Sequence, residues 1–170
     1  SERVNAQNAP AVPYFSTVFA DTVTLTKNVT VSLGTFPTAS GDVRVLELKG
    51  DNLDIDNLAI TLPGRYGDGM LTTGGDTTQV RGGPVTIMAT ELKATPAVGK
   101  VSAPRAEIDL SRDDINAVLD KLGVPESHPV PDAEVPDVIM DHIELRDVTL
   151  ELVNLKGAHF NAPTVTVGLE

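Results

Sequence analysis

Short runs of alternating apolar and polar residues dominate the chain, and this two-residue period predicts β-strands. In residues 17–33 the apolar positions alternate with threonine and serine on both sides of Lys27 and Asn28. Residues of this type favour the half-buried surface of a sheet. We therefore expect a hairpin in this region, with its turn at Lys27 and Asn28 and a threonine-rich outer face.

The segments 43–62 and 142–155 share a second pattern, in which the alternation changes parity along the run. In the first segment the apolar positions are Leu46 and Leu48, then Leu53 and Ile55, then Leu58, Ile60 and Leu62. In the second they are Ile143 and Leu145, then Val148, Leu150 and Leu152. Because successive side chains point to opposite faces of a strand, each change of parity requires a turn or a bulge. We interpret the two segments as related β units.

Further strands are expected at residues 85–92, at 101–110 and in the stretch 138–169, and a single helix is expected at about 111–122. The apolar stripe of this helix consists of Ile115, Val118, Leu119 and Leu122. Ser111 is the expected N-cap and Gly123 the expected C-terminal stop.

Three segments show neither the two-residue period of a strand nor the apolar stripe of a helix. Residues 1–13 read as an N-terminal arm, residues 63–84 as a Gly-rich loop or broad hairpin tip, and residues 124–136, with four prolines, as a strap in extended conformation. The remainder, residues 14–170, is expected to form a single β-rich domain. The predicted fold class is mainly β: an antiparallel sandwich or barrel-like sheet with one amphipathic helix.

Composition narrows the functions that such a domain can have. Aromatic residues make up 4% of the chain and there is no tryptophan, so the core must be aliphatic and stacking platforms for bases or sugars are disfavoured. The formal net charge is −11, which repels phosphate backbones and argues against a nucleic-acid partner.

The chain has no cysteine, which excludes disulfides and thiolate chemistry, and no apolar run long enough for a transmembrane segment. It begins with Ser1 and Glu2 rather than Met, as expected of a processed, exported protein. We therefore expect an extracellular or cell-envelope location. Asn28 opens the triplet Asn-Val-Thr, an acceptor pattern for N-glycosylation.

No catalytic motif stands out. The chain contains no G-x-S-x-G elbow, no Walker A loop and no G-x-G-x-x-G turn between a strand and a helix, so we expect neither an enzyme nor a bound organic cofactor.

Two groups of residues are weak candidates for metal ligands. Asp51, Asp54 and Asp56 concentrate oxygen ligands of the kind that calcium takes, although the segment departs from the EF-hand pattern. The alternation of these aspartates with Leu53 and Ile55 also fits an amphipathic strand with a carboxylate face.

The second group consists of His142, Glu144 and His159, which are ligand types for zinc, but the chain has no H-E-x-x-H motif. A polar pair two residues apart, such as His142 and Glu144, is also what any solvent-facing strand displays.

Two functions from different classes fit these observations. The first is a non-enzymatic secreted or cell-surface structural protein that binds a protein partner or self-assembles through its β edges and its N-terminal arm. The second is a carrier of a lipid or other apolar small molecule in a cavity lined by Val and Leu and enclosed by the strands and the helix. Residues 46–64, LELKGDNLDIDNLAITLPG, resemble repeats of envelope lipid-handling β proteins, but they contain no motif specific enough to transfer a function.

Overall fold

The computed structural model describes residues 16–62, 69–98, 101–124, 139–156, 159–161 and 166–169. Most of these residues belong to one antiparallel β-sheet. The elements in chain order are β1 (Ser16–Thr38), β2 (Gly41–Gly50), β3 (Asn52–Asp56), β4 (Ala59–Leu62), β5 (Gly69–Thr72), β6 (Thr77–Arg81), β7 (Val85–Val98), β8 (Val101–Ser102), β9 (Ala106–Asp109), α1 (Ile115–Leu122), β10 (Ile139–Lys156), β11 (His159–Asn161) and β12 (Thr166–Leu169).

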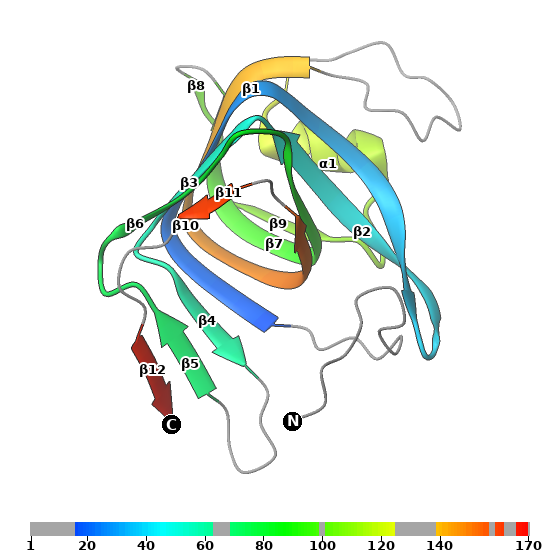
Figure 1. Ribbon diagram of the computed structural model, residues 1–170. Coiled ribbons are helices and arrows are strands. Elements are labelled where there is room, and N and C mark those ends of the chain that lie inside the picture. Colours follow the sequence, from blue (N-terminus) through cyan, green and yellow to red (C-terminus); the bar gives the residue numbers. More distant parts are fainter. Residues whose placement is uncertain are drawn as a thin grey trace.

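Four strands close into a barrel. β10 pairs with β1 along one edge and with β7 along the other, while β2 joins β7 to β1. The long, bent strands β1, β7 and β10 therefore curve around a common interior, which Figure 1 shows end on. The prediction of a mainly β, barrel-like sheet with one helix is confirmed.

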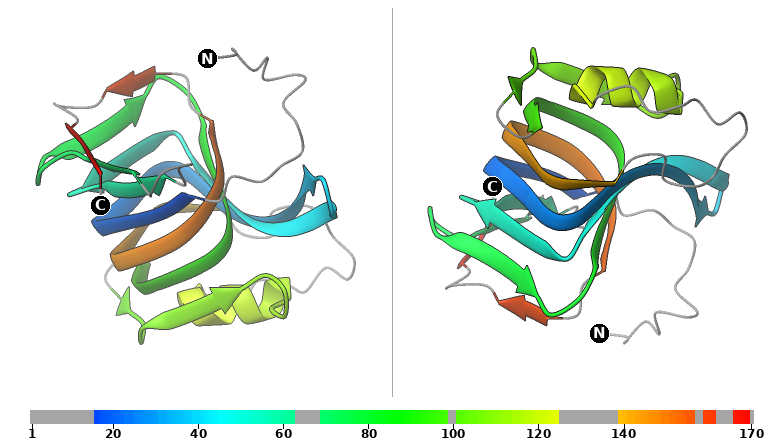
Figure 2. Two further views of the ribbon diagram at one scale, coloured as in Figure 1. Left: turned by 90° about the horizontal axis from the view of Figure 1, so that it is seen from below. Right: turned by 90° about the horizontal axis from the view of Figure 1, so that it is seen from above.

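The remaining strands extend this barrel on two sides. β3 and β4 both pair with β1. β6 then pairs with β3, and β5 pairs with β4. β8 and β9 pair with β7. Figure 2 shows that α1 and β9 lie on one side of the barrel and β6 on the opposite side.

Three neighbouring segments of the sheet are irregular at the same level of the barrel. Asn57 separates β3 from β4 and Asp147 lies inside β10, both with positive φ angles, 54° and 51°. Asp21 of β1 lies between them, and the ladder of β1 with β10 skips Asp21 and Asp147. Asn57 Nδ2 donates to Asp21 Oδ2 at 3.2 Å. We call these three residues the crease.

The inward-facing set of side chains changes parity at the crease in each strand. In β10, for example, Ile143 and Leu145 are buried before Asp147, and Val148 and Leu150 after it. An irregular residue bends a strand and lets the next side chain point to the same face, so the crease keeps aliphatic residues inside where the sheet turns. The prediction that the parity changes of residues 43–62 and 142–155 mark turns or bulges is confirmed at Asp51, Asn57 and Asp147.

The expected hairpin at Lys27 and Asn28 is wrong, because β1 runs through both residues without reversing. Their φ angles are 66° and 52°, values typical of a tight turn, but here they form a bulge at which the register with β10 shifts. Asp51 stabilises the bulge, since its N–H donates to Lys27 O at 2.9 Å and its carboxylate accepts from Asn28 Nδ2 at 2.8 Å.

Residues 63–84 do not form one long loop, because β5 and β6 lie within them. The loop was predicted from the many glycines of this segment. Glycine is required only in tight connections such as the one at Gly74 and Gly75, where both residues have positive φ. The predicted arm, residues 1–13, and residues 125–136 of the predicted strap lie outside the described residues.

The helix starts later than expected, at Ile115 rather than near Ser111. Its N-cap is Asp114, whose carboxylate accepts from the N–H of Ala117 at 2.8 Å. The hydroxyl and N–H of Ser111 instead donate to Asp109 Oδ1, which keeps that residue in the preceding turn. Gly123 ends the helix with a φ of 74°, as the sequence predicts.

Asp113 fastens the helix to the barrel. Its carboxylate, 11% exposed, accepts from the N–H of Asp109 at 3.0 Å and from Lys121 Nζ at 2.9 Å. The hydrogen bond from Asp109 and the ammonium group of Lys121 hold the pKa of Asp113 below its ordinary value. Arg44 Nη2 also donates to Asp113 O at 3.0 Å, which ties the helix to β2.

The first prediction concerns the crease. The exposed Asn57 holds a left-handed backbone that β-branched residues disfavour, whereas glycine adopts it freely. Asn57→Val should lower the free energy of unfolding by about 1–2 kcal/mol relative to Asn57→Gly in urea denaturation. Equal stabilities would show that the backbone at residue 57 does not constrain the fold.

The second prediction concerns pH. Because the folded state lowers the pKa of Asp113, its contribution is complete above the unfolded value, about 3.9, and is lost as the pH falls through the folded value. Asp113→Asn should cost about 1–2 kcal/mol at pH 7, and the difference from the native chain should shrink below about pH 4. A difference that stays constant from pH 7 to pH 3 would exclude this charge effect.

Candidate functional site

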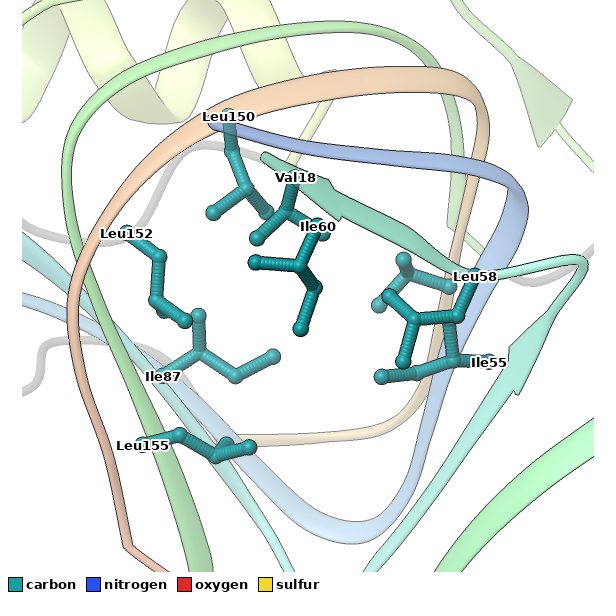
Figure 3. Close-up of a pocket in the computed structure, with 9 residues that line it drawn as sticks. Val18, Ile55, Leu58, Ile60, Ile87, Leu150, Leu152 and Leu155 are labelled. Carbon is teal, nitrogen blue, oxygen red and sulfur yellow. The ribbon is translucent and has the colours of Figure 1, made fainter. Parts of the chain in front are cut away.

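The barrel interior contains a partly open cavity, and the lining residues that the structure describes are all aliphatic. Its volume is about 50 Å³. Figure 3 shows these side chains pointing toward one another from the surrounding strands. The lining residues are Val18, Val23, Ile55, Leu58, Ile60, Ile87, Leu150, Leu152 and Leu155.

The crease brings these residues together. Val18 and Val23 lie on opposite sides of Asp21 in β1, and Ile55 and Leu58 lie on opposite sides of Asn57. In a regular strand, residues three or five apart would face opposite surfaces of the sheet. The change of parity at the crease places both members of each pair on the inner surface.

Among the described residues of the lining, no group can act as an acid, a base, a nucleophile or a metal ligand. A charged ligand group would lose its hydration here without gaining a partner among the lining residues, which is strongly unfavourable. Water would also find no hydrogen-bond partner on the lining, and apolar cavities of this kind stay dry and take up small apolar molecules. The cavity therefore suits an aliphatic group.

Its volume limits what can enter. Pockets that enclose drug-sized ligands measure about 300–1,000 Å³, and an engineered apolar cavity of about 150 Å³ holds benzene. A cavity of about 50 Å³ fits a narrow hydrocarbon segment and is too small for a fused ring system without movement of the strands. The helix α1 contributes no residue to this lining, contrary to the expectation that it helps to enclose a cavity.

The three aspartates considered for calcium each have a different partner. Asp51 accepts from Asn28, and Asp54 forms an ion pair with Arg81 at 2.6 Å. Asp56 accepts from the hydroxyls of Thr22 and Thr77, and these hydrogen bonds hold its pKa below the ordinary value. In the described part of the chain, no three His, Asp or Glu residues are grouped so that they could hold a metal ion.

The residues considered for zinc lie on two parts of the sheet. His142 and Glu144 are on β10, beside β1, and Glu144 forms an ion pair with Arg146 at 2.8 Å. His159 is on β11, which pairs with β6, so that β1, β3 and β6 separate it from β10. The sheet order therefore does not place the three residues on neighbouring strands.

Asn28 is exposed at the bulge of β1, where its side-chain amide is hydrogen-bonded to Asp51.

The structure describes one helix, α1, which has eight residues. Within the described residues, no helix is long and apolar enough to cross a membrane.

Sequence reasoning raised a cavity lined by Val and Leu only as part of an alternative function, and it could not say which apolar strand positions would line that cavity. Alternation predicts which face a side chain occupies, whereas a cavity depends on how far opposite strands stand apart.

Comparisons with known proteins returned nothing: no family model matches the chain, and neither a curated protein nor a solved structure matches it.

The third prediction concerns calcium. Because Asp51, Asp54 and Asp56 are already engaged by separate partners, millimolar calcium should leave the unfolding temperature unchanged. Differential scanning calorimetry with calcium and with a chelator checks this. A concentration-dependent rise that Asp56→Asn removes would demonstrate a calcium site.

Proposed function

We propose that this protein binds the hydrocarbon part of an apolar or amphiphilic small molecule inside its β-barrel. The observation that carries the proposal is the cavity, whose nine lining residues are all aliphatic. A fully packed barrel would give no reason to expect a ligand, because natural cores are close-packed and voids larger than a water molecule are few.

Burial of hydrocarbon supplies the driving force. Each methylene group that leaves water contributes about 0.8 kcal/mol. The enclosed volume of about 50 Å³ admits only a short segment, so the cavity favours a narrow chain over a bulky ring. The lining offers hydrocarbon surface alone, which makes it a site for binding or transport rather than for a reaction.

The other predicted function, assembly through β edges and the N-terminal arm, receives less support. Among the described strands, β9, β11 and β12 each pair with one neighbour and so leave an edge, but no observation indicates what would pair with these edges, and the arm lies outside the described residues. That function stays a prediction, as does an extracellular or envelope location.

The fourth prediction tests the proposal by filling the cavity. Val18→Phe places additional carbon atoms in the space, so it should abolish binding while changing the stability by less than about 1 kcal/mol. Binding is measured by titrating the chain, labelled at its isoleucine methyl groups, with 1-hexanol and following the signals of Ile55, Ile60 and Ile87. Ile108 and Ile143, which are buried outside the lining, serve as internal references.

Two matched variants complete this experiment. Phe19→Leu changes an exposed neighbour on the outer face of the same strand and should leave binding intact. Val31→Phe places the same ring in a fully buried position away from the cavity and should destabilise the chain by about 1–3 kcal/mol. If native chain and Val18→Phe respond alike to 1-hexanol, the cavity is not the binding site.

A further inference from the structure

Thr78 is a buried polar residue whose side chain has no partner. It lies on β6 and is 0% exposed. Its hydroxyl has no hydrogen-bond partner among the described residues. Buried hydroxyl groups in folded proteins are nearly always hydrogen-bonded, so this exception requires an explanation.

A second buried threonine nearby shows the normal pattern. The Thr73 hydroxyl, also in the β5–β6 region, accepts from the N–H of Leu58 at 3.1 Å and donates to Asp76 O at 3.1 Å. The burial of the Thr73 hydroxyl is therefore explained by its hydrogen bonds, which stabilise the connection between β5 and β6. No such role accounts for Thr78.

The register places Thr78 next to the cavity. Thr78 is directly opposite Ile55 in the antiparallel pair of β3 and β6, and Ile55 lines the cavity. Directly opposite residues point to the same face of a sheet, with Cβ atoms about 4.5–5.5 Å apart. The Thr78 side chain therefore lies on the inner surface of the sheet beside Ile55, although Thr78 itself is not among the residues that line the cavity.

We propose that Thr78 is the polar anchor of this binding site and that the ligand carries a neutral hydrogen-bonding oxygen, such as a hydroxyl or carbonyl group. The inference rests on the proposed function. The ligand oxygen reaches the buried Thr78 hydroxyl by displacing the Ile55 side chain, while the methylene groups next to that oxygen lie between Val18, Ile60 and Leu150.

The ligand oxygen is neutral because the surrounding groups cannot stabilise a charge. No charged side chain lines the cavity, and the neighbours of Thr78 on the inner face of β3 and β6, Leu53, Ile55 and Val80, are apolar. A carboxylate in this place would be desolvated without a cation to pair with. An alcohol, a ketone or an ester satisfies Thr78 without that penalty.

The fifth prediction compares three probes of equal chain length, n-hexane, 1-hexanol and hexanoate, in the isoleucine-methyl titration. The native chain should bind 1-hexanol more tightly than hexane, and hexanoate least tightly. Thr78→Val, which keeps the shape and removes the hydroxyl, should weaken 1-hexanol binding by about fivefold to tenfold and leave hexane binding unchanged.

Three controls make the outcomes distinct. Thr78→Ser retains the hydroxyl and should retain the preference for 1-hexanol, and Thr24→Val makes the same replacement on the outer face of β1 and should change nothing. The unfolding temperature of Thr78→Val should equal or exceed that of the native chain, because the hydroxyl has no partner to lose.

The results separate the two proposals. If the native chain binds hexane and 1-hexanol and Thr78→Val preserves their ratio, the anchor is refuted while the cavity remains a binding site. If neither probe shifts the methyl signals of the native chain, the proposed function itself fails. A marked loss of stability in Thr78→Val would reveal a structural partner and would also refute the anchor.

Discussion

The fold depends on one constraint: three neighbouring strands must change their inward-facing parity at the same level. Asp21, Asn57 and Asp147 meet this constraint together, because each is the irregular position of its segment and the side chains of Asn57 and Asp21 are hydrogen-bonded to one another. A break in one strand alone would turn its later apolar residues outward while its neighbours kept theirs inside. Aligned breaks let the whole sheet bend and close.

The crease also accounts for the space inside the barrel. It places side chains from both of its sides on the inner surface of the barrel, and the side chains that meet there are valine, leucine and isoleucine. These side chains leave a void that larger aromatic residues could have filled. A partly unfilled aliphatic interior and a buried hydroxyl without a partner occur side by side, at Ile55 and Thr78. Both features favour a ligand with a hydrocarbon part and one neutral oxygen.

Much of the architecture could be predicted from local sequence. The parity changes located the interruptions at Asp51, Asn57 and Asp147, and the stripe of Val118, Leu119 and Leu122 identified the helix. Other features depend on distant contacts. Lys27 and Asn28 have turn-like dihedral angles within a continuous strand, because β10 and the β2–β3 segment flank β1 on both sides. Asp114 rather than Ser111 is the N-cap, because the Ser111 hydroxyl is hydrogen-bonded to Asp109 in the preceding turn. A cavity lined by Val and Leu was one expectation from the sequence, but its position and size were beyond prediction, since they depend on the spacing between strands that are remote in sequence.

A crystal structure determined under xenon pressure tests the central claim most directly, because xenon enters apolar cavities without any need for a known ligand. The account predicts a xenon atom inside the barrel, in contact with Val18, Ile60 and Leu150 and absent from crystals of Val18→Phe. A barrel interior that takes up no xenon, with these side chains packed against one another, would contradict it.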